Sequence, residues 1–231
     1  MKNSVQHFLA CFIALIPLIY LGIIWDHLPA TVPTHFDIYG KPNDYSSRSS
    51  LWLIMGFLSL ISIGVYFLVF YINKIDPKRA NQGVPSGMRN IARGTTVFIS
   101  LLGILMLRSS LHPEQIDNLR FVPTLIGLLF LFLGNYLYRV RPNYFIGFKL
   151  PWTLSSNYNW KKTHQLAGIL WFLGGLFIAI LSFWNFLLDR LFLPIVLIIV
   201  IVPIAYSFSL FLRRNDIPEY FDEENKREEN S

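Results

Sequence analysis

Residues 191–212 read LFLPIVLIIVIVPIAYSFSLFL and contain no charged side chain. A run of about 20 apolar residues is long enough to cross the hydrocarbon layer of a membrane as a helix, because each residue adds about 1.5 Å. The bilayer interior offers no water to unpaired backbone groups, so a helix is the form we expect for this run. It therefore indicates an integral membrane protein.

Five more apolar runs precede this one, and the composition of the chain agrees with them. Of its 231 residues, 53% are hydrophobic and only 15% are charged, whereas charged residues make up about a quarter of a soluble domain. The six predicted membrane helices span 5–25, 51–73, 94–111, 121–138, 166–188 and 191–212, and Arg108 is their only fully charged residue. We therefore expect an all-α fold: a polytopic membrane helical bundle with six transmembrane helices and two long structured loops.

The positive charges alternate between the two sides of the predicted membrane helices. Fifteen of the 20 Lys and Arg residues fall on the side that holds both termini. Positive residues gather on the cytoplasmic side, so both termini are predicted to be cytoplasmic. This bias also explains the net charge of +6, and we expect contact with membrane lipids but no direct nucleic-acid binding. The lone cysteine, Cys11, excludes an internal disulfide.

The predicted helices and loops suggest a division of the chain into four parts. Residues 1–73 form an N-terminal two-span unit, with an extracytoplasmic loop rich in His and Asp at 26–50. Residues 74–118 hold a basic cytoplasmic linker and the third span. Residues 119–212 form a three-span unit with a cytoplasmic loop at 139–165. Residues 213–231 form a charged cytoplasmic tail, for which we expect disorder because its composition cannot bury a core.

The outer loop, residues 26–50, is predicted to be an ordered lid. Its three prolines exclude a regular helix, and one short strand is expected at 35–39. Its histidines and aspartates are possible metal ligands, but they lack helical ligand spacing and a thiolate partner, so we expect no metal and no cofactor. A ligand on the outer face is expected to meet His35, Phe36, Asp37 and Tyr39.

The cytoplasmic loop, residues 139–165, is unusually aromatic. Ser155 or Ser156 is expected to cap a helix that places Trp160, His164, Ala167 and Trp171 on one face, because their spacings are four, three and four. Tryptophan and tyrosine favour the head-group level, and the lysines face phosphates, so the plainest interpretation is an interfacial segment. The expected ligand-binding or partner-binding residues of this loop are Arg139, Arg141, Asn143, Gly147, Lys149, Trp152, Thr153, Trp160 and His164.

Two stretches resemble the SdpI family of bacterial integral membrane proteins, which is named for the immunity protein against a sporulation-delaying toxin. The first combines Pro142-Asn143, an aromatic residue before Ile146-Gly147, Pro151-Trp152-Thr153 and the run from Trp160 to Thr163-His164. The second combines Leu28-Pro29, Pro33 with His35-Phe36, and Gly40 with Pro42, and is similar to a short domain of unknown function that commonly precedes the first. The chain departs from the pattern at Lys149, where arginine is expected and would offer a planar fork.

The resemblance implies a multi-pass protein of the bacterial inner membrane. At least one such relative protects its cell from a secreted toxic peptide and captures a transcriptional repressor at the membrane. We therefore expect a non-enzymatic immunity or receptor protein that gives resistance to a toxic peptide or membrane stress, bacteriocins included. It would bind a peptide on its outer face and signal to a cytoplasmic partner such as a transcriptional repressor.

Two alternative functions stay open at the level of sequence. The first is a transporter of a small solute or lipid, because halves of three spans have opposite orientations, as in inverted repeats. The predicted spans contain no Asp or Glu, which disfavours an ion-coupled carrier. The second is an enzyme that modifies lipid head groups, in which Arg139, Arg141, Lys149 and His164 hold a phosphate. No nucleophile motif or pair of carboxylates accompanies them, so we expect no catalytic residue.

Overall fold

The computed structural model describes residues 2–36, 42–75, 86–112, 121–220, 222 and 226. The chain divides into two compact units. Unit 1 comprises residues 1–71, 85–126 and 179–185, and unit 2 comprises residues 72–84, 127–178 and 186–231. Each unit is described by itself below.

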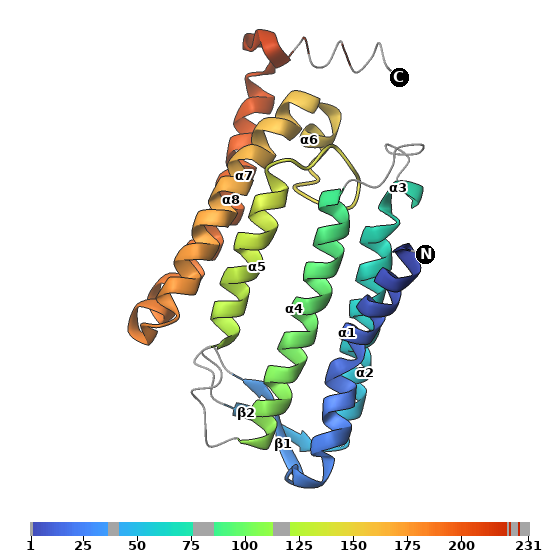
Figure 1. Ribbon diagram of the computed structural model, residues 1–231. Coiled ribbons are helices and arrows are strands. Elements are labelled where there is room, and N and C mark those ends of the chain that lie inside the picture. The colour runs from blue at the N-terminus through green and yellow to red at the C-terminus, as the bar shows by residue number, and fades with distance from the viewer. Residues whose placement is uncertain are drawn as a thin grey trace. The chain divides into compact units, whose positions relative to one another are not determined.

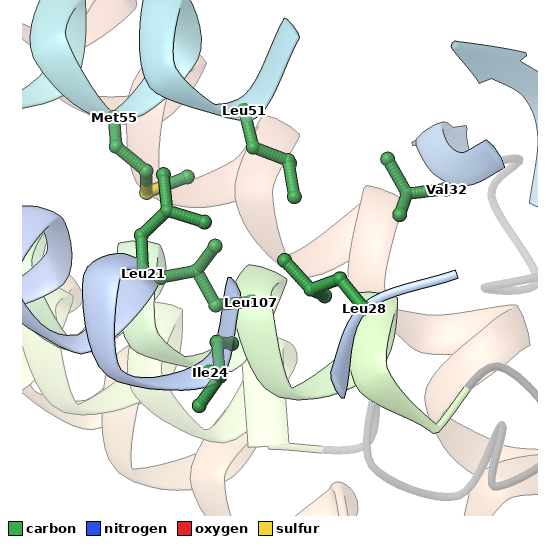
Figure 2. Packing of buried hydrophobic residues seen from close by; sticks show 7 residues of the cluster. All are labelled: Leu21, Ile24, Leu28, Val32, Leu51, Met55 and Leu107. Carbon is green, nitrogen blue, oxygen red and sulfur yellow. The ribbon is translucent and has the colours of Figure 1, made fainter. Parts of the chain in front are cut away.

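Unit 1 is built around three apolar helices, α1 (Lys2–Ile24), α2 (Ser50–Phe70) and α4 (Ser86–Leu111). Their hydrophobic core gathers at one end, where Leu21 of α1, Met55 of α2 and Leu107 of α4 are each fully buried (Figure 2). Leu28 and Val32, from the chain that follows α1, join the same cluster. This core therefore fixes the outer loop onto the ends of the three helices.

The outer loop contains a β-hairpin at this end of the three helices (Figure 1). After a short 3-10 turn, η1 (Trp25–His27), strand β1 (Thr31–Phe36) pairs antiparallel with β2 (Pro42–Ser47). The ladder is irregular on either side of His35. The prediction of one short strand at 35–39 was incomplete, because pairing begins four residues earlier, and residues 37–39 lie outside the described residues. The described part of the loop forms a hairpin, and its two strands qualify the all-α prediction.

Two prolines inside helices leave carbonyl groups that neighbouring helices satisfy. A proline has no N–H, so the carbonyl four residues before it lacks its helical partner. Pro17 of α1 frees the carbonyl of Ile13, which accepts a hydrogen bond of 2.8 Å from Oγ of Ser100 in α4. In unit 2, Pro203 of α8 frees the carbonyl of Ile199, which accepts a bond of 3.0 Å from Nε1 of Trp171 in α7. Each proline therefore creates a polar link to a neighbouring helix.

Unit 2 contains α6 (Pro151–Ser155) and most of three longer helices. These are α5 (Phe121–Leu137) from Gly127 onward, α7 (Asn157–Leu181) up to Ile178, and α8 (Asn185–Leu212) from Phe186 onward. Helices α5 and α7 approach so closely that a Cβ on Gly134 would lie 2.5 Å from the backbone nitrogen of Phe172. A Cβ on Gly168 would lie 2.7 Å from the backbone nitrogen of Tyr138, and one on Gly175 would collide with the carbonyl of Gly127. Glycine is therefore the only residue that lets these two backbones meet.

Within the described residues, five helices are long and apolar enough to cross a membrane, namely α1, α2, α4, α7 and α8. Helix α5 is apolar but has only 17 residues. A multi-pass helical membrane protein is therefore confirmed, while six complete crossings stay a prediction. Helices α4 and α7 begin eight or more residues before the predicted spans, at Ser86 and Asn157, and α7 ends at Leu181 rather than 188.

The structure describes the first residues of the tail, up to Tyr220, while the expected disorder of the tail stays a prediction. A 3-10 turn, η4 (Arg214–Asp216), follows α8. At the other end of unit 2, its first residues form a short helix, α3 (Ile72–Ile75). The turn after η4 brings Tyr220 to 1% exposure, with its ring centroid 5.6 Å from that of Tyr158 in α7. An aromatic contact therefore joins the described start of the tail to α7.

Candidate functional site

The candidate site is the segment 139–165 of unit 2, called here the signature segment. It runs from the end of α5 through an irregular loop and α6 to the first two turns of α7. Asn143, Thr153, Trp160 and His164 are at most 1% exposed. Because buried polar groups need hydrogen-bond partners, their bonds reveal what the segment does.

Asn143 organises the first part of the loop. Its Oδ1 accepts hydrogen bonds from the backbone N–H groups of Phe145 and Ile146, at 2.9 and 2.6 Å. Its Nδ2 donates to the carbonyls of Arg141 and Ile146, at 2.9 and 3.0 Å. The side-chain amide of Asn143 therefore satisfies backbone N–H and carbonyl groups that have no partner in a helix or sheet, and it fixes the conformation of the loop.

His164 ties the middle of the loop to α7 through both ring nitrogens. Its Nε2 accepts a 2.9 Å hydrogen bond from the backbone N–H of Phe148, and its Nδ1 lies 2.7 Å from the carbonyl of Trp160. A backbone N–H can only donate and a carbonyl can only accept, so the imidazole is neutral and carries its hydrogen on Nδ1. The ring also stacks on Trp160, with centroids 4.0 Å apart.

Gly147 makes room for this arrangement. Its φ of +111° lies in the region that side chains rarely adopt, and a Cβ at this position would collide with Nε2 of His164. Trp160 closes the other side of the loop, because its Nε1 donates a 2.9 Å hydrogen bond to the carbonyl of Val140. Glycine, histidine and tryptophan therefore form one interlocked unit.

Thr153 fixes the start of α6. Its hydroxyl accepts a 3.0 Å hydrogen bond from the backbone N–H of Leu150 and lies 2.6 Å from the carbonyl of Phe148. Pro151 occupies the first turn of α6, where its missing N–H costs nothing. The helix that follows begins as expected, because Oγ of Ser156 accepts a 3.2 Å bond from the N–H of Asn159.

The signature segment is also fastened to α8 through Ser207. Nε1 of Trp152 donates a 3.0 Å hydrogen bond to Oγ of Ser207, whose carbonyl accepts a 2.9 Å bond from Nδ2 of Asn159. Oδ1 of Asn159 in turn accepts a 2.9 Å bond from the hydroxyl of Thr163. Asn159, Thr163 and Ser207 were not among the expected binding residues, although Thr163 belongs to the stretch that carries the family resemblance. Their spacing of four offered a signal for Asn159 and Thr163, but nothing local distinguished Ser207.

The cations of the site lie on the outside of this scaffold. Arg139, Arg141 and Lys149 are exposed, whereas the side chains of Asn143, Thr153, Trp160 and His164 are buried. The structure therefore divides the expected binding residues into an internal scaffold and an exposed basic surface. His164 does not lie with the cations as a phosphate ligand, because both of its nitrogens are taken by backbone groups.

The expected outer residues belong to unit 1. His35 is exposed on β1, and its Nδ1 lies 2.6 Å from Oδ1 of Asn43 across the hairpin. Phe36 ends the same strand, while Asp37 and Tyr39 lie outside the described residues. Among the residues that the structure describes, no cluster of three or more His, Cys, Asp or Glu side chains could hold a metal ion.

The long apolar helices define a multi-pass membrane protein, and comparison of its sequence with known proteins shows which family it resembles. Residues 139–207 match the SdpI/YfhL protein family, and residues 12–58 match a domain of unknown function, DUF1648. The expected resemblance to the SdpI family and to its preceding domain is therefore confirmed.

A curated relative of the chain is the immunity protein SdpI of Bacillus subtilis (strain 168). The two are 25% identical over 185 residues, which cover 80% of this chain and 83% of the relative. The similarity therefore extends through both units and not only through the signature segment. No solved structure matches the chain.

Proposed function

We propose that this protein is a non-enzymatic immunity protein that protects a bacterium from a toxic peptide acting at its membrane. The observation that carries the proposal is the similarity to an immunity protein over four fifths of the chain. The hydrogen bonds of the signature segment support it, because they describe a rigid scaffold. An immunity protein needs such a scaffold to present a binding surface, and it needs no reacting group.

The arrangement of polar groups favours binding over catalysis. A general base or a nucleophile must have a lone pair or a proton that can reach a substrate. In the signature segment, both ring nitrogens of His164 are hydrogen-bonded to backbone groups. The oxygen and the nitrogen of the Asn143 amide are both hydrogen-bonded to backbone groups of the loop. These side chains hold the protein together and have no capacity left for a reaction.

The outer hairpin is the surface that we assign to the peptide. Asp26, His35 and Asp44 are exposed there, and Tyr45 is 57% exposed. The charge of Arg48 is engaged within the protein, because its guanidinium lies 4.8 Å from the ring centroid of Trp25 and donates to the carbonyls of Trp25 and Leu28. The described surface therefore offers carboxylates and an aromatic ring, which suit a cationic amphipathic peptide.

The peptide is expected to bind through side chains rather than by adding a strand. Strand addition needs free backbone N–H groups at the edge of a sheet. In the register pair Pro33 and Tyr45, Pro33 has no N–H, and the N–H of Tyr45 donates a 2.9 Å hydrogen bond to Oδ1 of Asp44. Asp37 and Tyr39 complete the proposed surface on the evidence of sequence alone.

The signature segment is assigned to the cytoplasmic face, with both termini on the same side. The distribution of Lys and Arg supports this orientation. Its exposed Arg139, Arg141 and Lys149 would bind anionic lipid or an acidic surface of a cytoplasmic partner, through which occupancy is signalled. Signalling also requires that bound peptide favours one of two conformations of the protein.

Survival of a sensitive bacterium tests the proposed function. Cells that express the chain are expected to grow at concentrations of a cationic membrane-active peptide that stop cells with an empty vector. The variant D44N/Y45A should lose this protection, and the variant N43D should keep it, at equal amounts of protein in the membrane. Equal survival of vector and protein-expressing cells, across a panel of such peptides, would refute immunity.

Labelling of single cysteines tests the orientation. In a C11S background, cysteines at Asn43 and Asn225 are exposed to a membrane-impermeant thiol reagent outside intact cells. We expect Cys at 43 to react and Cys at 225 to react only after the cells are opened. Labelling of both from outside would contradict the proposed topology.

A further inference from the structure

The first turns of α1 and the last turns of α2 in unit 1 enclose a histidine between two tyrosines. Nδ1 of His7 lies 3.0 Å from the hydroxyl of Tyr66, and Nε2 lies 3.0 Å from the hydroxyl of Tyr71. The rings of Phe67 and Phe70 lie against the imidazole, at centroid distances of 5.4 and 4.6 Å. Both nitrogens are therefore bonded inside an aromatic enclosure.

The partners of His7 differ in kind from those of His164. The partners of His164 are a backbone N–H and a backbone carbonyl, whose roles as donor and acceptor are fixed. The partners of His7 are hydroxyl groups, and a hydroxyl can either donate or accept. His7 therefore keeps both hydrogen bonds in either neutral tautomer and in the protonated form, whereas His164 keeps both in one form only.

We propose that His7, Tyr66 and Tyr71 form a proton-binding site. When a proton from water reaches the imidazole nitrogen that has been accepting, the tyrosine hydroxyl that was donating to it turns and becomes the acceptor. No covalent bond between heavy atoms changes and no electron is transferred. The site gains one positive charge, and His7 donates to both tyrosines.

The three residues of the site differ in how far they are exposed. His7 and Tyr71 are partly exposed, and Tyr66 is 1% exposed. One helical turn deeper on the same face of α2, Ser62 is also 1% exposed, and its hydroxyl has no hydrogen-bond partner within the described part of the chain. Buried hydroxyl groups usually have hydrogen-bond partners, so Ser62 marks a second polar position on this face of α2, one turn beyond Tyr66.

Within the described residues, Arg93 and Cys11 also interact with a tyrosine of the site. Arg93 of α4 is exposed, interacts electrostatically with Tyr66 and lies 3.5 Å from the side chain of Gln6. Cys11 of α1, one turn after His7, also interacts with Tyr66. The two tyrosine hydroxyls remain the groups that face both nitrogens of His7.

Nitrogen NMR of the full chain in nanodiscs, labelled with ¹⁵N-histidine, tests the proposal. The variant H7Q identifies the signals of His7. As the pH falls, His7 is expected to pass reversibly from one protonated nitrogen to two, while His164 keeps its single protonated Nδ1. A His7 that holds one proton over the whole pH range in which the protein stays folded would overturn the proposal.

Two matched double variants test the role of the tyrosines. The variant Y66F/Y71F keeps both rings but removes the two hydroxyl groups that accept from His7. We compare it with the unmodified chain at the pH at which half of His7 is doubly protonated in that chain. At this pH the doubly protonated form should be absent from the variant. The control Y45F/Y138F removes two hydroxyls elsewhere and should titrate like the unmodified chain. If Y66F/Y71F titrates like that control, the tyrosines are no part of a proton site and the proposal fails.

Discussion

Phe148 donates its backbone N–H to Nε2 of His164, sixteen residues further along the chain. This bond joins the irregular loop to a regular helix, and Gly147 stands directly before the donor. The loop can make the bond only with a positive φ and without a side chain at position 147. A methyl group added at position 147 is therefore predicted to destabilise the protein.

Gly147→Ala is expected to destabilise unit 2 by about 2 kcal/mol, because the methyl group meets His164 and the backbone conformation is strained. Thermal unfolding in detergent, followed by tryptophan fluorescence, measures the loss. Gly56→Ala is the matched control, because its methyl group would enter open space. Equal melting temperatures for the two variants would contradict the arrangement.

Ser100→Ala is expected to cost about 1–3 kcal/mol, because it leaves the buried carbonyl of Ile13 without a partner. Pro17→Ala restores an N–H that can bond to the same carbonyl within α1. The loss from Ser100→Ala should therefore be much smaller when Pro17→Ala is also present. A double-mutant cycle of unfolding free energies measures this coupling, and additive effects would argue against it.

Gly134→Ala is expected to weaken the pairing of α5 and α7, because backbone atoms cannot move aside as a flexible side chain can. Overpacking of this kind costs about 1–3 kcal/mol. The variant Gly64→Ala, whose methyl group meets nothing within 4 Å, should be as stable as the unmodified chain or more so. Unfolding midpoints in the same detergent compare the two.

Arg48→Lys is expected to loosen the hairpin although the charge is kept. The guanidinium both stacks on Trp25 and donates to two carbonyls, and an ammonium group lacks the planar fork that does both. The cation–π part is worth about 0.5–1 kcal/mol. Faster proteolysis between residues 31 and 47 should follow. In a Trp25→Leu background the effect of Arg48→Lys should shrink, and an undiminished effect would show that the ring is not involved.

The helices could be predicted from sequence because apolar blocks of about 20 residues have few other stable forms. Their ends could not, because apolarity marks the part that lies in lipid, while a helix continues into polar sequence when its caps and packing allow. Helix α7 shows this, since Ser156 caps it well before the apolar residues begin. The hairpin was harder still, because the pairing of β1 and β2 joins polar, proline-containing segments across a turn.

The candidate site was predicted in its residues more than in their roles. The helical spacing correctly placed Trp160, His164 and Ala167 on one buried face. Aromatic and basic composition, however, suggested a surface for lipid, whereas Asn143, Trp160 and His164 turn inward and bond to backbone. A hydrogen bond to a backbone group does not depend on which residue supplies that group. The internal scaffold therefore could not be predicted from the residue types alone.

The burial of Tyr220 sets a practical limit on how the protein is engineered. A reporter or affinity tag joined between Leu212 and this ring would remove the aromatic cover of Tyr158 and disturb the start of α7. Fusions placed after the final serine keep that cover in place. The labelling position at Asn225 follows Tyr220 in the chain as well. A reagent attached there would report which side of the membrane holds the C-terminus and would leave the contact between Tyr220 and Tyr158 intact.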